Sequence, residues 1–198
     1  MGSPHAQGPR APEPTLSVSD LFEIFPPVIP TRSHMLRGLA VDDAADVFAY
    51  ACDPEVARYT LWPPHPSVEF TRGFLRMFTA PSLLSWAIVA PESGKVIGMV
   101  FLHSLNKHHK RAELSFNVAR SHWKRGIATE VARQILRFAF TQLGLNRIEA
   151  TCMPANAASR RVLEKLGFRH EGRSRRSHLR HDGFHDMELF AILRDEGS

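Results

Sequence analysis

The sequence is poor in cysteine and contains no long apolar run. Only two cysteines, Cys52 and Cys152, occur among the 198 residues, and each lies in an otherwise apolar segment. We therefore expect two buried free thiols rather than a disulfide, as in a protein of a reducing compartment such as the cytoplasm. No apolar stretch approaches the length of a membrane span, and the N-terminus lacks the basic-then-apolar pattern of a secretory signal. These absences argue against a disulfide-stabilised scaffold and a membrane protein.

The composition is otherwise ordinary for a globular chain, apart from an excess of positive charge. Hydrophobic residues make up 43% and charged residues 23%, and the length suits one domain with a full core. The net charge is +5, and much of the excess lies in residues 107–111 and 169–180. Two interpretations stay open: proximity to a ribosome or RNA, or a solvated face that complements the phosphates of a nucleotide cofactor.

The N-terminal part differs in composition from the rest. Half of the 14 prolines fall within residues 1–30, where no hydrophobic periodicity is sustained. We predict a flexible arm over residues 1–30 and one domain over residues 31–196. Within the arm, Ser19 and Asp20 are suited to cap a short apolar piece, 21–25, that docks on the domain.

Beyond the arm, the hydrophobic pattern alternates between strand and helix periods. A favoured two-residue type I′ turn is expected at Asp182-Gly183, between the last two strands. The other predicted strands cover residues 34–39, 85–90, 96–105, 111–118 and 147–153. The predicted helices run from Asp42 or Asp43 to Cys52, over 68–78 with Ser67 as cap, over 127–143, and from Asn156 to Gly167.

The most informative segment joins the strand at 111–118 to the helix that follows it. Gly126 and Ala128 let the backbone approach a ligand closely, and the unpaired N–H groups of the helix's first turn are anion donors. Lys124 and Arg125 add positive charge beside them. The sequence therefore predicts a pyrophosphate cradle, although neither the Rossmann nor the Walker spacing fits.

This loop resembles the acetyl-CoA loop of the GNAT N-acetyltransferase superfamily, Arg/Gln-x-x-Gly-x-Gly/Ala, with Trp123 at the first position. A second segment, Asn156-x-x-Ser159-x-x-x-Leu163-x-x-x-Gly167-Phe168, is similar to the superfamily's helix along the pantetheine arm. With the phrases NRIEATCMPANAASRRVLEKLGFRHEG and DGFHDMELFAIL, the resemblance narrows to the ribosomal-protein N-alanine acetyltransferases (RimJ/RimL-like). It covers roughly residues 31–196.

The resemblance implies an α/β fold, α+β in some schemes. A central mixed, mostly antiparallel sheet carries helices on both faces, and its strands around 112–118 and 147–153 splay apart to admit acetyl-CoA. It also implies direct acetyl transfer in a ternary complex, with acetyl-CoA as donor and no metal. The residues expected to bind the cofactor are Phe116, Val118, Lys124, Arg125, Gly126, Ile127, Ala128, Thr129, Asn156 and Ser159. For Asn156, a plain helix N-cap is the alternative role.

Acetyl transfer needs a neutral amine to attack the thioester. An α-amino group has a pKa of about 8, so roughly a tenth to a fifth is neutral at pH 7 and a weak base suffices. Glu113 is one candidate base, because it lies on the polar face of the strand before the loop; its alternative is an ion pair with Lys110 or Arg111. Some relatives use a Glu of the C-terminal hairpin, and the matching position here is His178, whose alternative is a solvated strand histidine. Ser159 is expected to donate to the departing thiolate, a role that some relatives assign to the serine of this motif.

The C-terminal hairpin is rich in histidine, which invites a metal site. With the expected turn, His178 pairs with Met187 and His181 with Phe184, so these histidines point to opposite faces. The imidazoles, including His185, then do not converge, and we predict no metal.

The acceptor is less constrained than the donor. The favoured acceptor is a peptide α-amino group; a small-molecule amine such as a polyamine, amino acid or antibiotic, and a silent acyl-CoA-binding module, are the alternatives. In relatives, the loop around Trp62 and Pro63-Pro64 gates the acceptor site, and the position of Asp186 anchors a local network, here with Arg175. The chain is compatible with a monomer or a homodimer.

Overall fold

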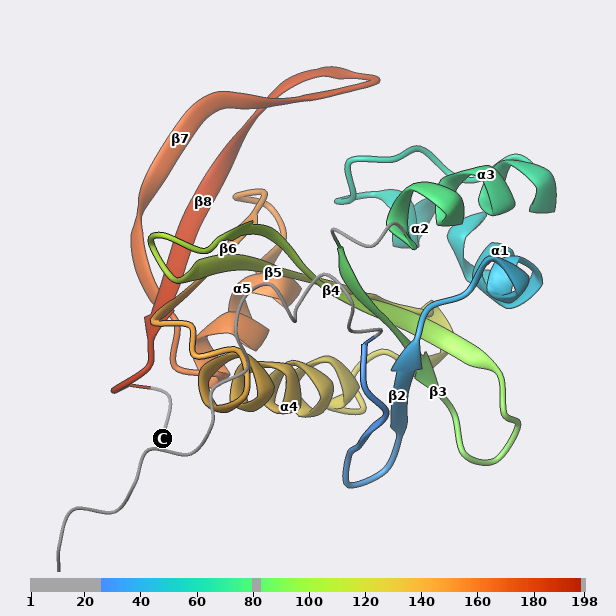
Figure 1. Ribbon diagram of the computed structural model, residues 1–198. Helices are drawn as coiled ribbons and strands as arrows, with labels where there is room; N and C mark the ends of the chain where they lie inside the picture. Colours follow the sequence, from blue (N-terminus) through green and yellow to red (C-terminus); the bar gives the residue numbers. More distant parts are fainter. Residues whose placement is uncertain (1–25, 80–82, 197–198) are drawn as a thin grey trace, which may run out of the picture.

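The computed structural model describes residues 26–79 and 83–196, which form an eight-stranded sheet with helices on both faces (Figure 1). The strand order is β1-β2-β3-β4-β5-β6-β8-β7, and every neighbouring pair is antiparallel except β5 and β6. The strands are β1 Ile29–Pro30, β2 Met35–Gly38, β3 Leu84–Val89, β4 Val96–Asn106, β5 Arg111–Val118, β6 Arg147–Cys152, β7 Arg169–Arg180 and β8 Gly183–Leu193. The helices are η2 Val41–Asp43, α1 Ala44–Ala51, α2 Pro54–Ala57, α3 Val68–Phe78, η3 Arg120–His122, α4 Ile127–Thr141 and α5 Ala157–Lys165.

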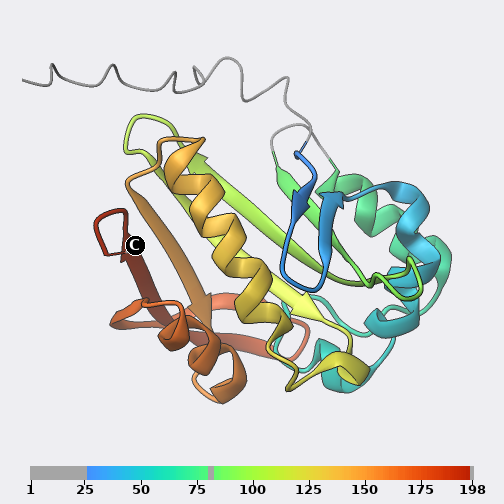
Figure 2. The ribbon, with the colours of Figure 1, turned by 90° about the horizontal axis from the view of Figure 1, so that it is seen from below.

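Alternate side chains of β3 show how both faces of the sheet are covered. The Trp86 ring contacts Phe138 of α4, with ring centroids 5.7 Å apart. The next residue toward the N-terminus, Ser85, donates its hydroxyl hydrogen to the Phe78 carbonyl oxygen of α3 at 2.6 Å. Since neighbouring strand residues point to opposite faces, α4 covers one face and α3 the other. Figure 2 shows α4 lying across the sheet.

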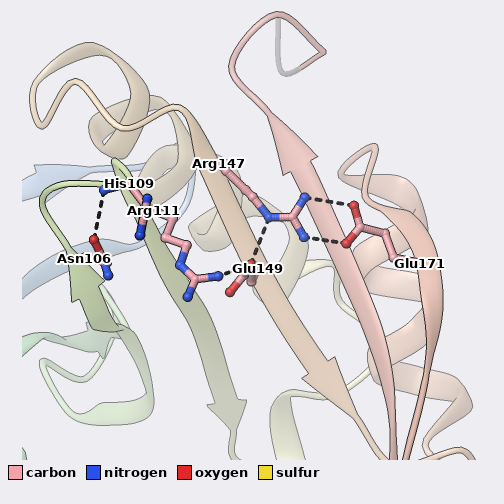
Figure 3. Close-up of polar contacts among 6 residues, drawn as sticks. All are labelled: Asn106, His109, Arg111, Arg147, Glu149 and Glu171. Carbon is pink, nitrogen blue, oxygen red and sulfur yellow. Dashed lines mark hydrogen bonds and ion pairs between the residues drawn. The ribbon is translucent and has the colours of Figure 1, made fainter.

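Strands β5 and β6 are paired over only part of their length. Their parallel register covers Arg111 to Glu113 on β5 and Arg147 to Glu149 on β6, and beyond these positions the strands separate. This is the splay that the family resemblance implied. At the paired end, Glu149 accepts hydrogen bonds from Arg111 at 3.2 Å and from Arg147 Nε at 2.9 Å, and Arg147 also forks onto Glu171 of β7 (Figure 3).

Several local predictions are confirmed. Helix α3 spans residues 68–78 as expected, and the Ser67 hydroxyl accepts from the Phe70 amide at 3.1 Å. The periodic apolar residues of α4 are buried at Ile127, Val131 and Ile135.

Two local expectations are wrong, and one helix was missed. The last hairpin turns at His181-Asp182, because Arg180 pairs with Gly183, so the register is one residue earlier than Asp182-Gly183 predicts. Cys52 is exposed rather than buried, since it follows the last turn of α1, whereas Cys152 is buried and both thiols are free. Helix α2 was not predicted, although Asp53 caps it by accepting from Glu55 at 2.9 Å.

The expected N-terminal arm lies mostly outside the described residues. The capped piece at 21–25 falls there entirely. Of the remainder, Ile29 and Pro30 form β1 and pair with β2, and the Pro27 carbonyl oxygen accepts from Trp86 Nε1 at 3.0 Å. The last residues of the predicted arm therefore belong to the edge of the sheet.

Candidate active site

A cleft of about 640 Å³ opens where β5 and β6 separate. One wall comes from α2 and the residues after it, and the other from the start of α4 and one side of α5. The expected cofactor residues line this cleft with the exception of Arg125; they are Phe116, Val118, Lys124, Gly126, Ile127, Ala128, Thr129, Asn156 and Ser159.

The loop before α4 has the backbone shape of an anion cradle. Gly126 is the N-cap of α4 with φ 80°, and it offers no side chain to the first-turn N–H groups. Lys124 also has positive φ, 63°, a conformation that occurs in the anion-binding nests formed by successive backbone N–H groups. A Cβ placed on Gly126 would meet no protein atom within 4 Å, so the space beside it belongs to the cleft.

Trp123, which departs from the family pattern, has a definite structural role. Its indole N–H donates to the Val118 carbonyl oxygen at 2.7 Å. Val118 ends β5 and lines the cleft, so this bond ties the loop to the end of the strand. Trp123 is 42% exposed and itself lines the cleft.

Asn156 and Ser159 lie together at the start of α5. The Asn156 side-chain oxygen accepts from the Ser159 backbone N–H at 3.0 Å, so Asn156 does cap the helix. An amide carries donors as well as an acceptor, and this bond uses only the oxygen. The cap therefore leaves the Asn156 NH₂ group available to a ligand in the cleft that both residues line.

One whole wall of the cleft, and part of the other, was not predicted from the sequence. The missed wall consists of Glu55, Val56, Arg58, Tyr59 and Thr60, in and after α2. The signal was present: Asp53 followed by proline is a helix N-cap followed by a residue suited to N1. The missed part of the other wall is Ala158, Arg161, Val162 and Lys165 of α5. The loop at Trp62, by contrast, packs inward against His65 and Phe74.

Two further side chains of the cleft were not anticipated. The Asn117 side-chain oxygen is buried and has no hydrogen-bond partner within residues 26–79 and 83–196. His122 lies near the cradle, and burial, with a smaller effect of Arg125, lowers the pKa of its imidazole. A neutral ring is thus favoured at pH 7, because the ordinary pKa is already about 6.5.

The β7–β8 hairpin reaches over to the α2 side (Figure 1). Near its tip, Arg180 is buried and donates to the Arg58 carbonyl oxygen at 2.9 Å. The same guanidinium lies 3.4 Å from the sulfur of Met153, just after β6. Arg180 therefore joins the hairpin, the end of β6 and the missed wall of the cleft.

The candidate bases lie outside the lining of the cleft. Glu113 occupies the last paired position before the splay, and its carboxylate accepts from the Thr151 hydroxyl at 3.0 Å. The ionisable group beside Glu113 is His103, whose Nδ1 lies 3.9 Å away, whereas Arg111, one of the expected partners of Glu113, bonds Glu149 instead. His178 lies near the hairpin tip, 3.1 Å from the Ser177 hydroxyl.

The corrected register changes the surroundings of the hairpin histidines. His178 pairs across the hairpin with His185, not with Met187. Within the described residues, no three His, Cys, Asp or Glu side chains are grouped as metal ligands. Asp186 does anchor a local structure, but its carboxylate accepts from the Arg176 backbone N–H at 2.9 Å, which holds a three-residue bulge in β7.

Cys152 can be assessed as a covalent nucleophile from its surroundings. It is 4% exposed, and burial raises the pKa of its thiol to about 11. The reactive form is the thiolate, so this residue is inert near neutral pH.

No helix in the described part of the chain is long and apolar enough to cross a bilayer.

Comparison with known proteins agrees with this geometry. The family model of the acetyltransferase (GNAT) domain matches residues 34–169. "Uncharacterized N-acetyltransferase YoaA" of Bacillus subtilis (strain 168) is 30% identical over 172 residues, covering 85% of this chain and 97% of the relative. "L-amino acid N-acetyltransferase AaaT" of Escherichia coli (strain K12) is 30% identical over 143 residues, 71% of this chain and 86% of the relative.

Solved structures show the same fold. Mycobacterium smegmatis RimJ in complex with CoA-disulfide superposes with a TM-score of 0.76 at 26% identity, covering 86% of this chain and 89% of that one. The chain belongs to the GNAT acetyltransferase family, which confirms the predicted family, fold and enzyme class. Its acyl donor is acetyl-CoA.

Proposed function

We propose that this GNAT enzyme acetylates the α-amino group of a peptide or protein N-terminus, with a ribosomal protein as one such acceptor. The observation that carries the proposal is the cleft at the β5–β6 splay, which runs from the Gly126 cradle to the wall made by α2. The sequence resemblance to the ribosomal-protein N-alanine acetyltransferases over residues 31–196 supports a protein acceptor.

The residues of the cleft fit coenzyme A in chemical character. The first-turn amides of α4 and the open space beside Gly126 suit a pyrophosphate. The end of β5, Phe116 to Val118, and the free amide group of Asn156 suit the pantetheine amides. When bound, acetyl-CoA supplies a thioester as acyl donor. Ser159 lies on the helix that Asn156 caps, and its hydroxyl would donate a hydrogen bond to the departing sulfur.

The charges of the cleft bear on the acceptor. Its lining contains one carboxylate, Glu55, and Arg58 lies 3.5 Å from it. The other ionisable groups of the lining, apart from Tyr59, are basic: His122, Lys124, Arg161 and Lys165. The lining therefore offers a polycation such as a polyamine one carboxylate that is already paired with Arg58, whereas an N-terminus with neutral or acidic neighbours needs no acidic partner.

Proton removal can be shared because the acceptor is an α-amine. Its pKa is about 8, so a useful fraction is neutral near pH 7 without a dedicated base. The Asn117 oxygen, buried and without a partner among the described residues, is suited to accept a hydrogen bond from the amine N–H. Glu113 and His178 would act through water, since neither lines the cleft.

A free amino acid is the second candidate acceptor. The observation that favours it is the 30% identity to an L-amino acid N-acetyltransferase over 86% of that relative. Its carboxylate would also suit a basic cleft.

A thiol-release assay with acetyl-CoA separates these acceptors. The panel contains short peptides with free N-terminal Ala or Ser, the same peptides with a blocked N-terminus and an internal Lys, free amino acids, and spermidine. We expect the highest kcat/KM for the free-N-terminus peptides, and mass spectrometry should place the acetyl group on the α-nitrogen. Turnover of amino acids or spermidine with inactive peptides would refute the proposal.

A further inference from the structure

Two basic residues of the cleft lie away from the pyrophosphate cradle. Arg161 and Lys165 are one helical turn apart on α5, both exposed and both on the lining of the cleft. Lys165 lies in the last turn of the helix, whereas Asn156 caps its start. At about 1.5 Å per residue, these ends are about 13 Å apart along the axis.

The acidic residues of α5 and of the first turn of α4 are engaged elsewhere. Glu164 lies 3.8 Å from Arg160, and the Arg160 guanidinium also lies over the Phe190 ring. Glu130, in the first turn of α4, accepts hydrogen bonds from Thr31 and Ser33. Neither Arg161 nor Lys165 forms an ion pair with any residue that the structure describes, so their charges face the cleft without a carboxylate partner.

Helix α4 brings the cradle and this basic pair into one continuous site. Arg133, two turns into α4, donates to the Lys165 carbonyl oxygen at 3.3 Å, so the end of α5 lies beside α4. The Gly126 cradle opens the same helix at its N-terminus. A ligand whose pyrophosphate occupies the cradle therefore has a second positive region within reach along α5.

We propose that Arg161 and Lys165 form a subsite for the 3′-phosphate of coenzyme A. This inference rests on acetyl-CoA binding with its pyrophosphate at the Gly126 loop. Coenzyme A carries a phosphate monoester separate from the pyrophosphate, which matches two separate positive regions. A guanidinium forks onto two phosphate oxygens, and an ammonium adds a point charge. The pair would make the enzyme distinguish coenzyme A from its 3′-dephospho form.

The test compares acetyl-CoA with 3′-dephospho-acetyl-CoA by calorimetry. The proteins are the wild type, Arg161→Gln/Lys165→Gln, the two single variants, and the control Arg160→Gln, which removes a neighbouring arginine that faces Phe190 and Glu164. We expect the wild type and the control to bind acetyl-CoA about 10- to 100-fold more tightly than the dephospho form. In the double variant this ratio should fall to about one, with the affinity for the dephospho form changed by less than about twofold.

Each other outcome overturns the subsite. A wild type with no preference between the two ligands has no 3′-phosphate contact. A double variant that keeps the full ratio places the contact elsewhere. A variant that loses equal affinity for both ligands, with an unchanged thermal unfolding curve, shows contacts to the pyrophosphate instead. Failure of the wild type to bind either ligand would refute the cofactor site itself, whereas loss of the ratio alone leaves that site intact.

Discussion

The two ends of the β5–β6 strand pair differ in how far their polar groups are paired. At the end where Arg111 meets Arg147, main-chain pairing is complete and Glu149 is shared between two arginines. At the other end the strands separate, and the cleft collects groups that the described residues leave unpaired: the first-turn amides of α4, the Asn117 oxygen and the basic pair on α5. The change is abrupt, because the cleft lining begins at Phe116, a few residues beyond the last paired position of β5.

This contrast locates the binding chemistry. The Asn117 oxygen is buried, and buried polar groups are nearly always satisfied in native proteins, so an unsatisfied one marks a place where a ligand can complete the bonding. We call the paired end the closed end and the separated end the open end. The closed end is a surface ion network whose members satisfy one another (Figure 3). We therefore expect mutations at the open end to change binding, and mutations at the closed end to change stability slightly.

Gly126→Val is expected to have the largest effect, because it fills the open end with a side chain. The new Cβ would point into space that is free of protein atoms, and φ 80° is strained for valine. We expect the Kd for acetyl-CoA, measured by calorimetry, to rise by about 100-fold or more, as lost hydrogen bonds to a charged group imply. The strain should also cost about 1–2 kcal/mol of stability.

Gly94→Val is the matched control for this variant. Gly94 has φ 67°, and a Cβ added to it would meet no protein atom within 4 Å, but it lies in the β3–β4 turn. It should lose similar stability and keep full affinity. Unchanged acetyl-CoA binding in a folded Gly126→Val protein would refute the cradle assignment.

Gly98→Ala is expected to damage the frame of the open end. Its Cβ would lie 2.4 Å from the Asn117 carbonyl oxygen and 3.1 Å from the Val118 Cα, so β4 and β5 must separate. Overpacking of this kind costs about 1–3 kcal/mol, which denaturant unfolding will measure. Gly38→Ala is the control, because its nearest contact would be an ordinary 3.8 Å. Equal stability of the two variants would contradict the close approach at Gly98.

Features of the fold that depend on neighbouring residues were predicted from the sequence, whereas features that depend on distant residues were not. The Gly126 loop and the Ser67 cap were predicted because their geometry is decided by a few neighbouring residues. Helix α2 was missed because four residues give no hydrophobic periodicity. The predicted hairpin register was wrong because the pairing of two long strands, rather than the local Asp-Gly preference, decides where the chain turns.

The parts of the site that sequence could not supply are those made by distant segments. Thr151 bonds Glu113 across 38 residues, and Arg180 bonds Arg58 across 122. No local pattern encodes such contacts. The second of these contacts joins the wall of the cleft formed after α2 to the β7–β8 hairpin.

Asn156→Ala tests whether one side chain serves both as cap and as ligand contact. Loss of the bond to the Ser159 amide should cost about 1 kcal/mol of stability. We also expect acetyl-CoA affinity to fall by about tenfold, beyond what unfolding explains, because the amide donors are lost as well. If thermal unfolding shifts while the Kd stays the same, Asn156 is only a cap. Asn156→Asp keeps the capping oxygen and removes the donors, so it should lose affinity with little change in stability.

Removing either candidate base should have a modest effect, because neither lines the cleft. We expect Glu113→Gln and His178→Ala each to lower kcat by less than about tenfold, and kcat to rise with pH until the α-amine is neutral at about pH 8. Loss of about 1,000-fold in either variant, with both substrates still bound, would identify that residue as a dedicated base. A lysine side chain as preferred acceptor would also contradict this prediction, since its pKa of about 10.4 leaves far less neutral amine.

The smallest effect is expected at the closed end, from Glu171→Gln. The hydrogen bonds from Arg147 lower the pKa of Glu171, so its ionised form stabilises the folded protein. The Glu171 side chain is 44% exposed, and exposed pairs contribute about 0.2–1 kcal/mol after solvent screening. A lowered folded-state pKa means that this contribution is present above the unfolded value of about 4.5 and is lost as pH falls through the folded value. The difference in unfolding free energy between wild type and variant should therefore be constant from about pH 6 to 8 and shrink below about pH 4.5. Acetyl-CoA affinity should not change. A difference that grows as pH falls would contradict a lowered pKa of Glu171. A loss of affinity would show that the two ends of the strand pair are not independent.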